Sequence, residues 1–285
     1  MDYISIDIES GRAPSPGRVQ ENCTPHRAET VECHRHAILN AIDSMRKDPS
    51  APHDLAQMAA AACMSRYHFL RVFEEATHIS PGRFLAALRM QQAKRLLLET
   101  SMPVTTICFE VGYNSLGTFT RLFTDCVGVS PSSFRKLIEA LAGHSIEALM
   151  ESYFQRRLPL RSKRIIAGSV YGPVDFHGVI FVGAFSSSIP RKLPITGSLL
   201  LHPGQFELAL EPGAQPRCLM AAGFPPNSNA INYLLPSPED VLVASTALSC
   251  QISEDSSPHD HDLILRPLQP FDPPILTALP ILLEH

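Results

Sequence analysis

The sequence repeats a pattern of twenty residues at a spacing of fifty positions, and this repeat limits the folds that the chain can adopt. The first copy, residues 65–84, reads SRYHFLRVFEEATHISPGRF, and the second, residues 115–134, reads SLGTFTRLFTDCVGVSPSSF. Seven of the twenty aligned positions are identical, including the arginine at 71 and 121. Two copies are too few for a solenoid. The repeat therefore predicts one small supersecondary unit that is used twice in a domain.

Each copy has the features of a capped amphipathic helix. Ser65 stands where a helix would begin and can accept a hydrogen bond from a free N–H group of the first turn. Phe69, Val72 and Phe73 follow at the spacing that places side chains on one helical face. The second copy repeats this arrangement from Ser115. We therefore expect the phenylalanines of both copies to be core residues.

The opposite face of each predicted helix carries a set of side chains that could contact another molecule. In the first copy these are Arg66, Tyr67, Leu70 and Arg71, and in the second they are Gly117, Thr118, Thr120 and Arg121. A single outward arginine is more often a surface residue in a salt bridge, which is the alternative for Arg71 and Arg121. Because the arginine recurs at the same place in two capped helices, we favour a binding role.

Short helical patterns precede both copies, and a longer one joins them. Asp54 can cap the first short helix, and a second follows Pro103 and ends at Gly112. The apolar spacing predicts a helix from Phe84 to Leu98 between the two units. A short helix, a tight turn and a second helix form the helix-turn-helix pattern, in which the second helix enters the major groove. Two joined units could place their recognition helices roughly 34 Å apart, one helical repeat of DNA.

Residues 34–137 resemble the DNA-binding domain of the AraC/XylS family of transcriptional regulators. The resemblance is carried by several short motifs: Asp54 to Phe73, Ser80-Pro81-x-x-Phe84, Ala93-Lys94-Arg95-Leu96-Leu97, Ile107 to Ser115, Phe119-Thr120-Arg121-x-Phe123 and Gly128-Val129-Ser130-Pro131-x-x-Phe134-Arg135. The sequence departs from the family pattern at Cys108, where alanine is usual, and at Thr77-His78, where the second residue is usually glycine. In most members the domain is C-terminal, whereas about 145 residues follow it here.

The resemblance implies a sequence-specific regulator of transcription, with activation as the direction typical of the family. By position, it assigns base contacts to the eight outward residues named above. Backbone N–H groups at Ser65 and Ser115 would hold phosphates. Because the first helix offers bulky side chains and the second small ones, we expect a non-palindromic site in double-stranded DNA. RNA polymerase and an unidentified effector are the further partners that the resemblance implies.

The charge distribution limits how strongly the sequence argues for a polyanion partner. The whole chain has a net charge of −4. Residues 33–140 carry 12 Lys and Arg against 9 Asp and Glu, a net charge of +3, and residues 161–285 carry 7 against 11, a net charge of −4. The bias is small, so a nucleic-acid function depends on where the charges lie. Seven cysteines without a Cys-x-x-Cys motif, and the lack of a long apolar run, predict a cytoplasmic protein without a membrane segment or disulfide framework.

The C-terminal part has the pattern of an all-β domain. It is rich in proline, and short apolar runs are separated by turn residues. Strands are predicted at Val179–Phe185, Gly197–Leu201, Gln205–Leu210, Cys218–Ala222, Val241–Ser245 and Leu263–Arg266. Many short strands with Pro/Gly turns are typical of a β-sandwich. The run from Val179 to Pro212-Gly213 resembles the transthyretin-like sandwich of carboxypeptidase regulatory domains, which implies a role in contacts rather than catalysis.

These patterns predict a multidomain protein with an all-α tandem helix-turn-helix domain followed by an all-β sandwich domain. The expected parts are a flexible tail (1–32), the DNA-binding domain (33–140), a helical connector (141–164) and the β-sandwich (165–285). We expect no catalytic residues, no cofactor and no metal, although Cys33-His34-x-His36 is a candidate metal-binding segment. Two alternatives to a specific regulator remain: a low-specificity DNA-architectural protein, and a ligand- or carbohydrate-binding β module with subordinate DNA binding. The absence of tryptophan argues against a carbohydrate platform.

Overall fold

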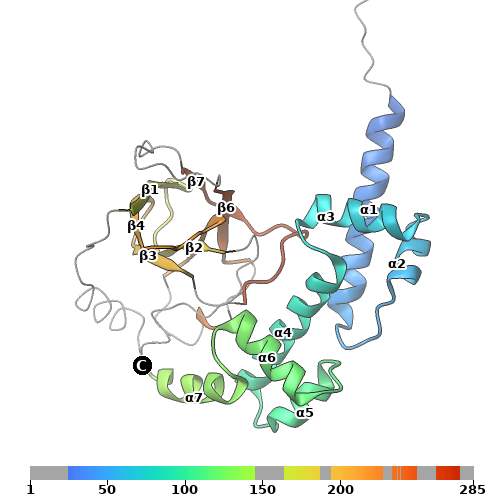
Figure 1. Ribbon diagram of the computed structural model, residues 1–285, viewed down its shortest axis with the longest axis horizontal. Coiled ribbons are helices and arrows are strands. Elements are labelled where there is room, and N and C mark those ends of the chain that lie inside the picture. Colours follow the sequence, from blue (N-terminus) through green and yellow to red (C-terminus); the bar gives the residue numbers. More distant parts are fainter. Residues whose placement is uncertain are drawn as a thin grey trace, which may run out of the picture.

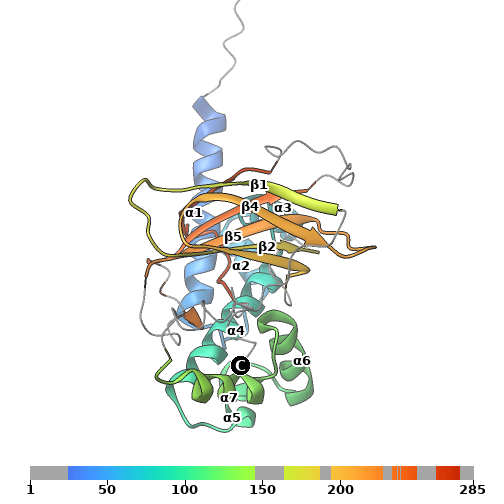
Figure 2. The same cartoon turned by 90° about the vertical axis from the view of Figure 1, so that its left-hand side faces the viewer.

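The computed structural model describes residues 25–144, 164–186, 194–226, 233–235, 237, 239–248 and 261–276. These residues form a helical N-terminal half and a β-rich C-terminal half that contact one another (Figures 1 and 2). Within the described ranges, no helix is long and apolar enough to cross a membrane. The predicted connector lies outside the described residues except at its two ends, since residues 145–163 are not among them.

Seven helices in the described residues make up the N-terminal half. They are α1 (Pro25–Lys47), α2 (Leu55–Ala61), α3 (Arg66–Thr77), α4 (Pro81–Glu99), α5 (Val104–Glu110), α6 (Leu116–Val127) and α7 (Pro131–Leu141). Helices α1 to α3 form one unit and α5 to α7 the other, with α4 running between them (Figure 1).

Helix α1 begins at Pro25, whereas the sequence assigned residues 1–32 to a flexible tail. Proline at the first position of a helix is favourable, because the N–H group it lacks would have no partner there. The last part of the predicted tail is therefore helical.

The repeated phenylalanines build the same aromatic row in both units. In the first, the ring centroids of Phe69 and Phe73 are 5.8 Å apart, and those of Phe73 and Phe84 are also 5.8 Å apart. In the second unit the corresponding rings lie 5.9 Å and 5.7 Å apart. All six rings are fully buried. At these centroid separations aromatic pairs attract one another beyond simple burial of surface, so the repeat specifies the same core twice.

The C-terminal half contains two sheets in the described residues. The strands are β1 (Arg164–Tyr171), β2 (Val179–Phe185), β3 (Thr196–Leu200), β4 (Gly204–Leu210), β5 (Cys218–Phe224), β6 (Leu242–Ala247), β7 (Leu263–Ile264) and β8 (Arg266–Pro267). Their order is β4-β1-β7 in the smaller sheet and β3-β2-β5-β6-β8 in the larger. All pairs are antiparallel except β1 with β7.

Strand β2 shows why the sequence carries an unbroken apolar run in this region. Ile180 and Val182 belong to the core enclosed by the two sheets, together with Phe206 from β4. The alternate residues Val179 and Phe181 belong instead to a core shared with the helical half. Because β2 is covered on both faces, every residue from Val179 to Phe185 is buried.

Strand β1 was not predicted from the sequence, which assigned only the start of the β region to residue 165. Gly168 and Ser169 interrupt its apolar pattern. A Cβ atom on Gly168 would lie 2.5 Å from the carbonyl oxygen of His261, so glycine allows this close approach. The predicted strands at 179–185, 197–201, 205–210, 218–222 and 241–245 correspond to β2 to β6, with shifts of one or two residues at the ends.

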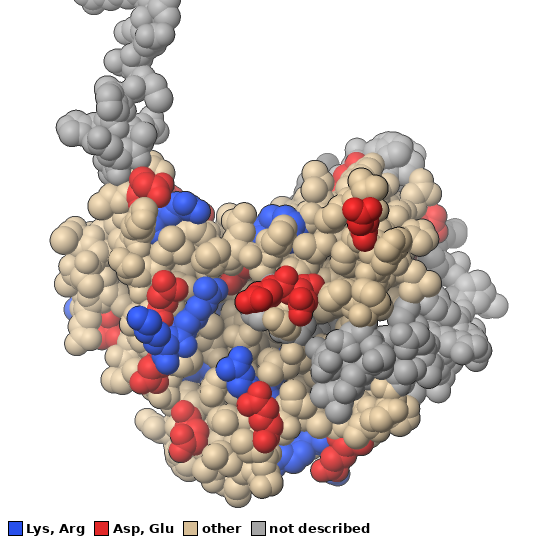
Figure 3. All heavy atoms as spheres, turned by 180° about the vertical axis from the view of Figure 1, so that it is seen from behind, with Lys and Arg blue, Asp and Glu red and all other residues tan. Residues whose placement is uncertain are grey.

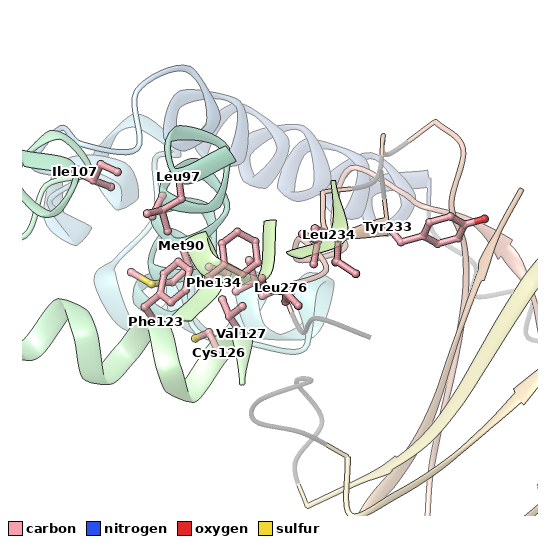
Figure 4. Packing of buried hydrophobic residues seen from close by; sticks show 14 of the residues in the cluster. Met90, Leu97, Ile107, Phe123, Cys126, Val127, Phe134, Tyr233, Leu234 and Leu276 are labelled. Carbon is pink, nitrogen blue, oxygen red and sulfur yellow. The ribbon is translucent and has the colours of Figure 1, made fainter. Parts of the chain in front are cut away.

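The two halves are joined by a shared apolar core and by the segment 265–276, which crosses the helices. Leu276 is buried beside Phe134 and Val127, and Leu234 and Tyr233 extend the same cluster towards the strands (Figure 4). The sequence divided the chain into separate domains. This core instead packs part of the β-rich half directly against the helices.

Candidate nucleic-acid interface

Helix α3 presents the side chains that the sequence assigned to DNA contact. The Ser65 hydroxyl caps α3 by accepting from the backbone N–H of His68 at 3.2 Å. Arg66, Tyr67 and Arg71 are exposed, with Tyr67 at 80% of its maximum. Leu70 is half-buried. An exposed tyrosine between two exposed arginines offers an aromatic ring and two guanidinium groups on one helical face.

Arg71 is engaged in an ion pair on the helix surface. Its Nη1 donates to Glu75 Oε1 at 2.9 Å, and its Nη2 lies 3.3 Å from His68 Nδ1. Both partners of the pair are more than half exposed. Exposed pairs at this spacing contribute only about 0.3–0.5 kcal/mol. The guanidinium can therefore exchange Glu75 for another acceptor at little loss.

Helix α6 has the same construction with smaller side chains. The Ser115 hydroxyl accepts from the backbone N–H of Thr118 at 3.3 Å. Gly117, Thr118 and Arg121 are exposed, whereas Thr120 is half-buried. Among the described residues, Arg121 has no hydrogen bond or ion pair, which leaves its whole donor set available. The two helices thus have the same serine cap and the same outward arginine position, and they differ in the size and polarity of their other outward side chains.

The turns that end the two helices differ at one residue. Gly128 ends α6 with a φ of +100°, a conformation that glycine adopts without strain. His78 ends α3 with a φ of +60°, in the left-handed region. This is the position where the sequence departs from the family pattern. The backbone adopts a left-handed turn in both units, and this conformation is strained at His78 because histidine has a Cβ atom.

Arg89 on α4 fixes the two units relative to one another. Its guanidinium donates to the carbonyl oxygens of Pro49 (2.8 Å), Ala51 (3.2 Å) and Gly112 (3.2 Å). It also lies over the ring of Tyr113, 5.5 Å from the centroid. The first two carbonyls belong to the loop before α2, and the third follows α5. No local sequence pattern assigns Arg89 this role, because its three partners are distant along the chain.

Gly112 is needed for the same arrangement. Its φ is +84°, and a Cβ atom there would lie 2.7 Å from the carbonyl oxygen of Ser50 and 3.1 Å from the Arg89 guanidinium. The tight turn before α6 thus depends on glycine for its backbone conformation and for space.

The face of the molecule seen from behind is not a continuous basic surface. Figure 3 shows Lys and Arg side chains interspersed with Asp and Glu over the helical half. Like the sequence charge count, this mixture argues against binding through net charge on that face.

The candidate metal ligands near α1 do not form a cluster. Cys33 and His36 are exposed, and His34 instead contacts His68, with Nε2 atoms 3.4 Å apart. Within the described residues, no group of three or more His, Cys, Asp or Glu side chains could hold a metal ion.

Residues 58–137 match a protein-family model described as a helix-turn-helix domain. An uncharacterized HTH-type transcriptional regulator of Haemophilus influenzae is 37% identical over 101 residues, which cover 35% of this chain and 34% of that protein. The arabinose operon regulatory protein of Salmonella typhimurium is 37% identical over 133 residues, or 42% of this chain and 47% of the relative. The RCS-specific HTH-type transcriptional activator RclR of Escherichia coli is 31% identical over 108 residues, 38% of each chain.

Among solved structures, the DNA-binding domain of AdpA, crystallised in complex with a target DNA, is 27% identical. The similarity covers 38% of this chain and 93% of that one, with a TM-score of 0.33. The chain spans about a third to a half of the length of these curated relatives. Residues 58–137 of the helical half therefore form a helix-turn-helix domain, and the similar proteins include HTH-type transcriptional regulators.

Proposed function

We propose that this protein is a transcriptional regulator that binds double-stranded DNA in a sequence-specific manner, with α3 and α6 in successive major grooves. The observation that carries the proposal is the pair of capped helices, each with an exposed arginine on its outer face and the same aromatic row behind it. The relatives named as transcriptional regulators support it. The proposal treats residues 33–140 as a tandem helix-turn-helix domain.

In this proposal the two helices read different bases. Arg66 and Arg71 can each bond guanine O6 and N7 in bidentate fashion, while Tyr67 and Leu70 supply apolar contact. In the second unit, Arg121 supplies the bidentate donor. The smaller Gly117, Thr118 and Thr120 allow closer approach and contact with a thymine methyl group. The site would therefore be non-palindromic.

Phosphates would be held by the first turn of each recognition helix rather than by the capping hydroxyls. The hydroxyls of Ser65 and Ser115 already accept hydrogen bonds within their own helices. The free N–H groups at the helix starts, aided by the helix dipole, are the available donors.

The test is selection of bound sequences from random DNA by the purified protein. Arg71→Ala and Arg121→Ala should each relax specificity at one position, at a cost of about 1–3 kcal/mol in affinity, and the two positions should lie about one helical turn apart. Arg217→Ala is the matched control, because Arg217 is exposed on the β-rich half and its loss changes the net charge equally. If all three variants select the same motif, the assigned contacts are wrong.

The same selection separates a specific regulator from a DNA-architectural protein. An architectural protein would bind random and selected DNA with similar affinity, and its affinity would fall steeply with salt. We favour the regulator because the outward side chains include Tyr67, Leu70 and two threonines, which suit base edges better than phosphates.

For the β-rich half, we propose a β-sandwich of the transthyretin-like kind that senses an effector or binds a protein such as RNA polymerase. The core enclosed by its two sheets and the positive φ of Gly213 at the predicted turn support this assignment. Activation is the direction we propose, and a reporter gene carrying the selected site would test it. We assign no catalytic role to this half.

A further inference from the structure

A cavity of about 630 Å³ lies where the two halves meet. Helices α1 and α4 form one side of it, and Leu235, Glu239, Val241 and residues of the segment 268–275 form the other. Pockets that bind small molecules commonly have volumes of 300–1,000 Å³ and occur at domain interfaces. The cavity thus has the size and position of a ligand site.

The two sides of the cavity differ in chemistry. The helical side contributes Arg46, Gln91, Gln92 and Arg95. The other side is mainly apolar, with Leu235, Val241, Leu268, Ile275 and several prolines. A few polar donors facing an apolar surface are the usual arrangement for a ligand with a polar group and an apolar body.

The charged residues that line the cavity are two arginines, Arg46 and Arg95, and two carboxylates, Glu239 and Asp272. Asp272 is neutralised by Arg266, whose two Nη atoms lie 2.6 Å and 2.9 Å from its carboxylate oxygens. Glu239 is exposed to solvent. Among the described residues, Arg95 has no hydrogen bond or ion pair to another protein group. Its guanidinium is free to bind an anion.

Arg46, like Arg95, is an exposed residue. Its Nη2 donates to the carbonyl oxygen of Pro270 at 2.8 Å, which leaves further N–H donors unassigned. Desolvation lowers the pKa of Arg46, against the opposing effect of Asp43 and Asp272.

We propose that this cavity binds a small carboxylate with an apolar body, held by Arg95 and Arg46 and packed against Leu235, Val241 and Ile275. The proposal deepens the effector-sensing role proposed for the β-rich half, but the binding itself requires no DNA.

Ligand binding at this place would act on the element that joins the two DNA-binding units. The segment 268–276 is attached to α4 by the hydrogen bond from Lys94 Nζ to the carbonyl oxygen of Leu276, 3.0 Å long. A ligand that contacts both sides would favour arrangements in which this segment lies against α4. It can shift such an equilibrium only by its difference in affinity for the two arrangements.

Isothermal titration calorimetry of the full chain with octanoate, hexanoate and phenylpropanoate tests the proposal. At least one of the three should bind, and the matched alcohol should bind at least about tenfold more weakly, because it lacks the charge. Arg95→Gln should weaken carboxylate binding by at least about tenfold. Arg83→Gln, which changes another exposed arginine of the same helix, should leave it unchanged.

Three results would overturn the proposal: no binding by any of the carboxylates, equal binding of alcohol and carboxylate, or unchanged affinity in Arg95→Gln. A second readout uses the absence of tryptophan from the chain. Gln92→Trp would place the only indole beside the cavity, and its fluorescence should change on addition of the bound carboxylate, whereas that of Arg217→Trp should not. These measurements are independent of DNA selection, so failure of one proposal is distinguishable from failure of the other.

Discussion

At the scale of single residues, the two units share positions but not side chains, and His78 shows the consequence most clearly. It holds the left-handed turn that Gly128 holds in the second unit. A non-glycine residue in this conformation loses roughly 1–2 kcal/mol relative to a favoured backbone region. The strain is tolerated because the capping N–H of His78 still donates to the Glu74 carbonyl, 2.8 Å away.

His78→Gly should therefore raise the free energy of unfolding by about 1 kcal/mol, measured by urea denaturation. The reciprocal control is Gly128→Ala, which should lower it by a similar amount because alanine is strained at a φ of +100°. A destabilised His78→Gly variant would show that contacts of the imidazole outweigh the backbone strain.

Lys94 is a second residue with an unusual environment, because it is a charged residue type in a fully buried position. It lies fully buried on α4, 5.9 Å from the centroid of the Phe134 ring, and burial lowers its pKa to about 7. An unfolded lysine has a pKa of about 10.4. Between these values the unfolded chain binds a proton that the folded chain does not, so stability rises with pH in this window.

Lys94→Met should remove this dependence. From pH 7 to pH 9.5, wild-type stability should rise relative to the variant by on the order of 3 kcal/mol, because each unit of the window contributes about 1.4 kcal/mol. Urea denaturation of both proteins at the two pH values gives the difference, in which the other titrating groups cancel. Parallel pH profiles would mean that Lys94 stays protonated in the fold.

At the scale of elements, α4 is more than a spacer between two helix-turn-helix units. Through Arg89 it binds the loop before α2 and the turn after α5. Through Arg46 and Lys94, helices α1 and α4 hold the segment 265–276. Besides the apolar cores, polar contacts of residues outside the recognition helices therefore hold the two units together.

Arg89→Met should lower the free energy of unfolding by about 2 kcal/mol, since it leaves three carbonyl groups of two units without their donor. The substitution should also weaken binding to the selected DNA, because the two units that carry the recognition helices would no longer be joined through Arg89. Arg83→Met is the control on the same helix and should be near neutral. Equal stability of the two variants would contradict a structural role for Arg89.

At the scale of the whole molecule, the two halves form one packed unit in the described residues. Leu276 is 3% exposed and lies in a core that contains side chains of α4, α6, α7 and β2. Any movement of the β-rich half away from the helices would expose this core. Signals from one half to the other can therefore be carried by packing.

Leu276→Ala should lower the free energy of unfolding by about 2–4 kcal/mol, the usual loss for a buried leucine. Leu201→Ala, at a position 53% exposed on the β-rich half, is the matched control and should change stability by less than about 0.5 kcal/mol. Urea denaturation measures both. A small effect at Leu276 would indicate that the halves are not coupled through this core.

The sequence alone determined the features that depend on local spacing. Helical periodicity and backbone sterics account for three of these features. They are the phenylalanines at four-residue spacing, the serines before α3 and α6, and the positive-φ glycine at 112. With the apolar spacing from Phe84 to Leu98, they predicted helices α2 to α6 and the outward faces of the recognition helices. Short apolar runs between turn residues predicted strands β2 to β6. Local signals failed at the start of α1 and at β1, where Pro25 and Gly168 resemble breaks in structure.

Only the tertiary structure decided which distant groups meet. Residues up to 182 positions apart meet in three places. Lys94 binds the carbonyl oxygen of Leu276, Arg89 binds three carbonyl oxygens, and Arg95 and Ile275 line the same cavity. No periodicity encodes these pairs, because each depends on how the completed elements pack. The sequence therefore specified two DNA-binding units and a β-rich half, and their packing created the junction that joins them.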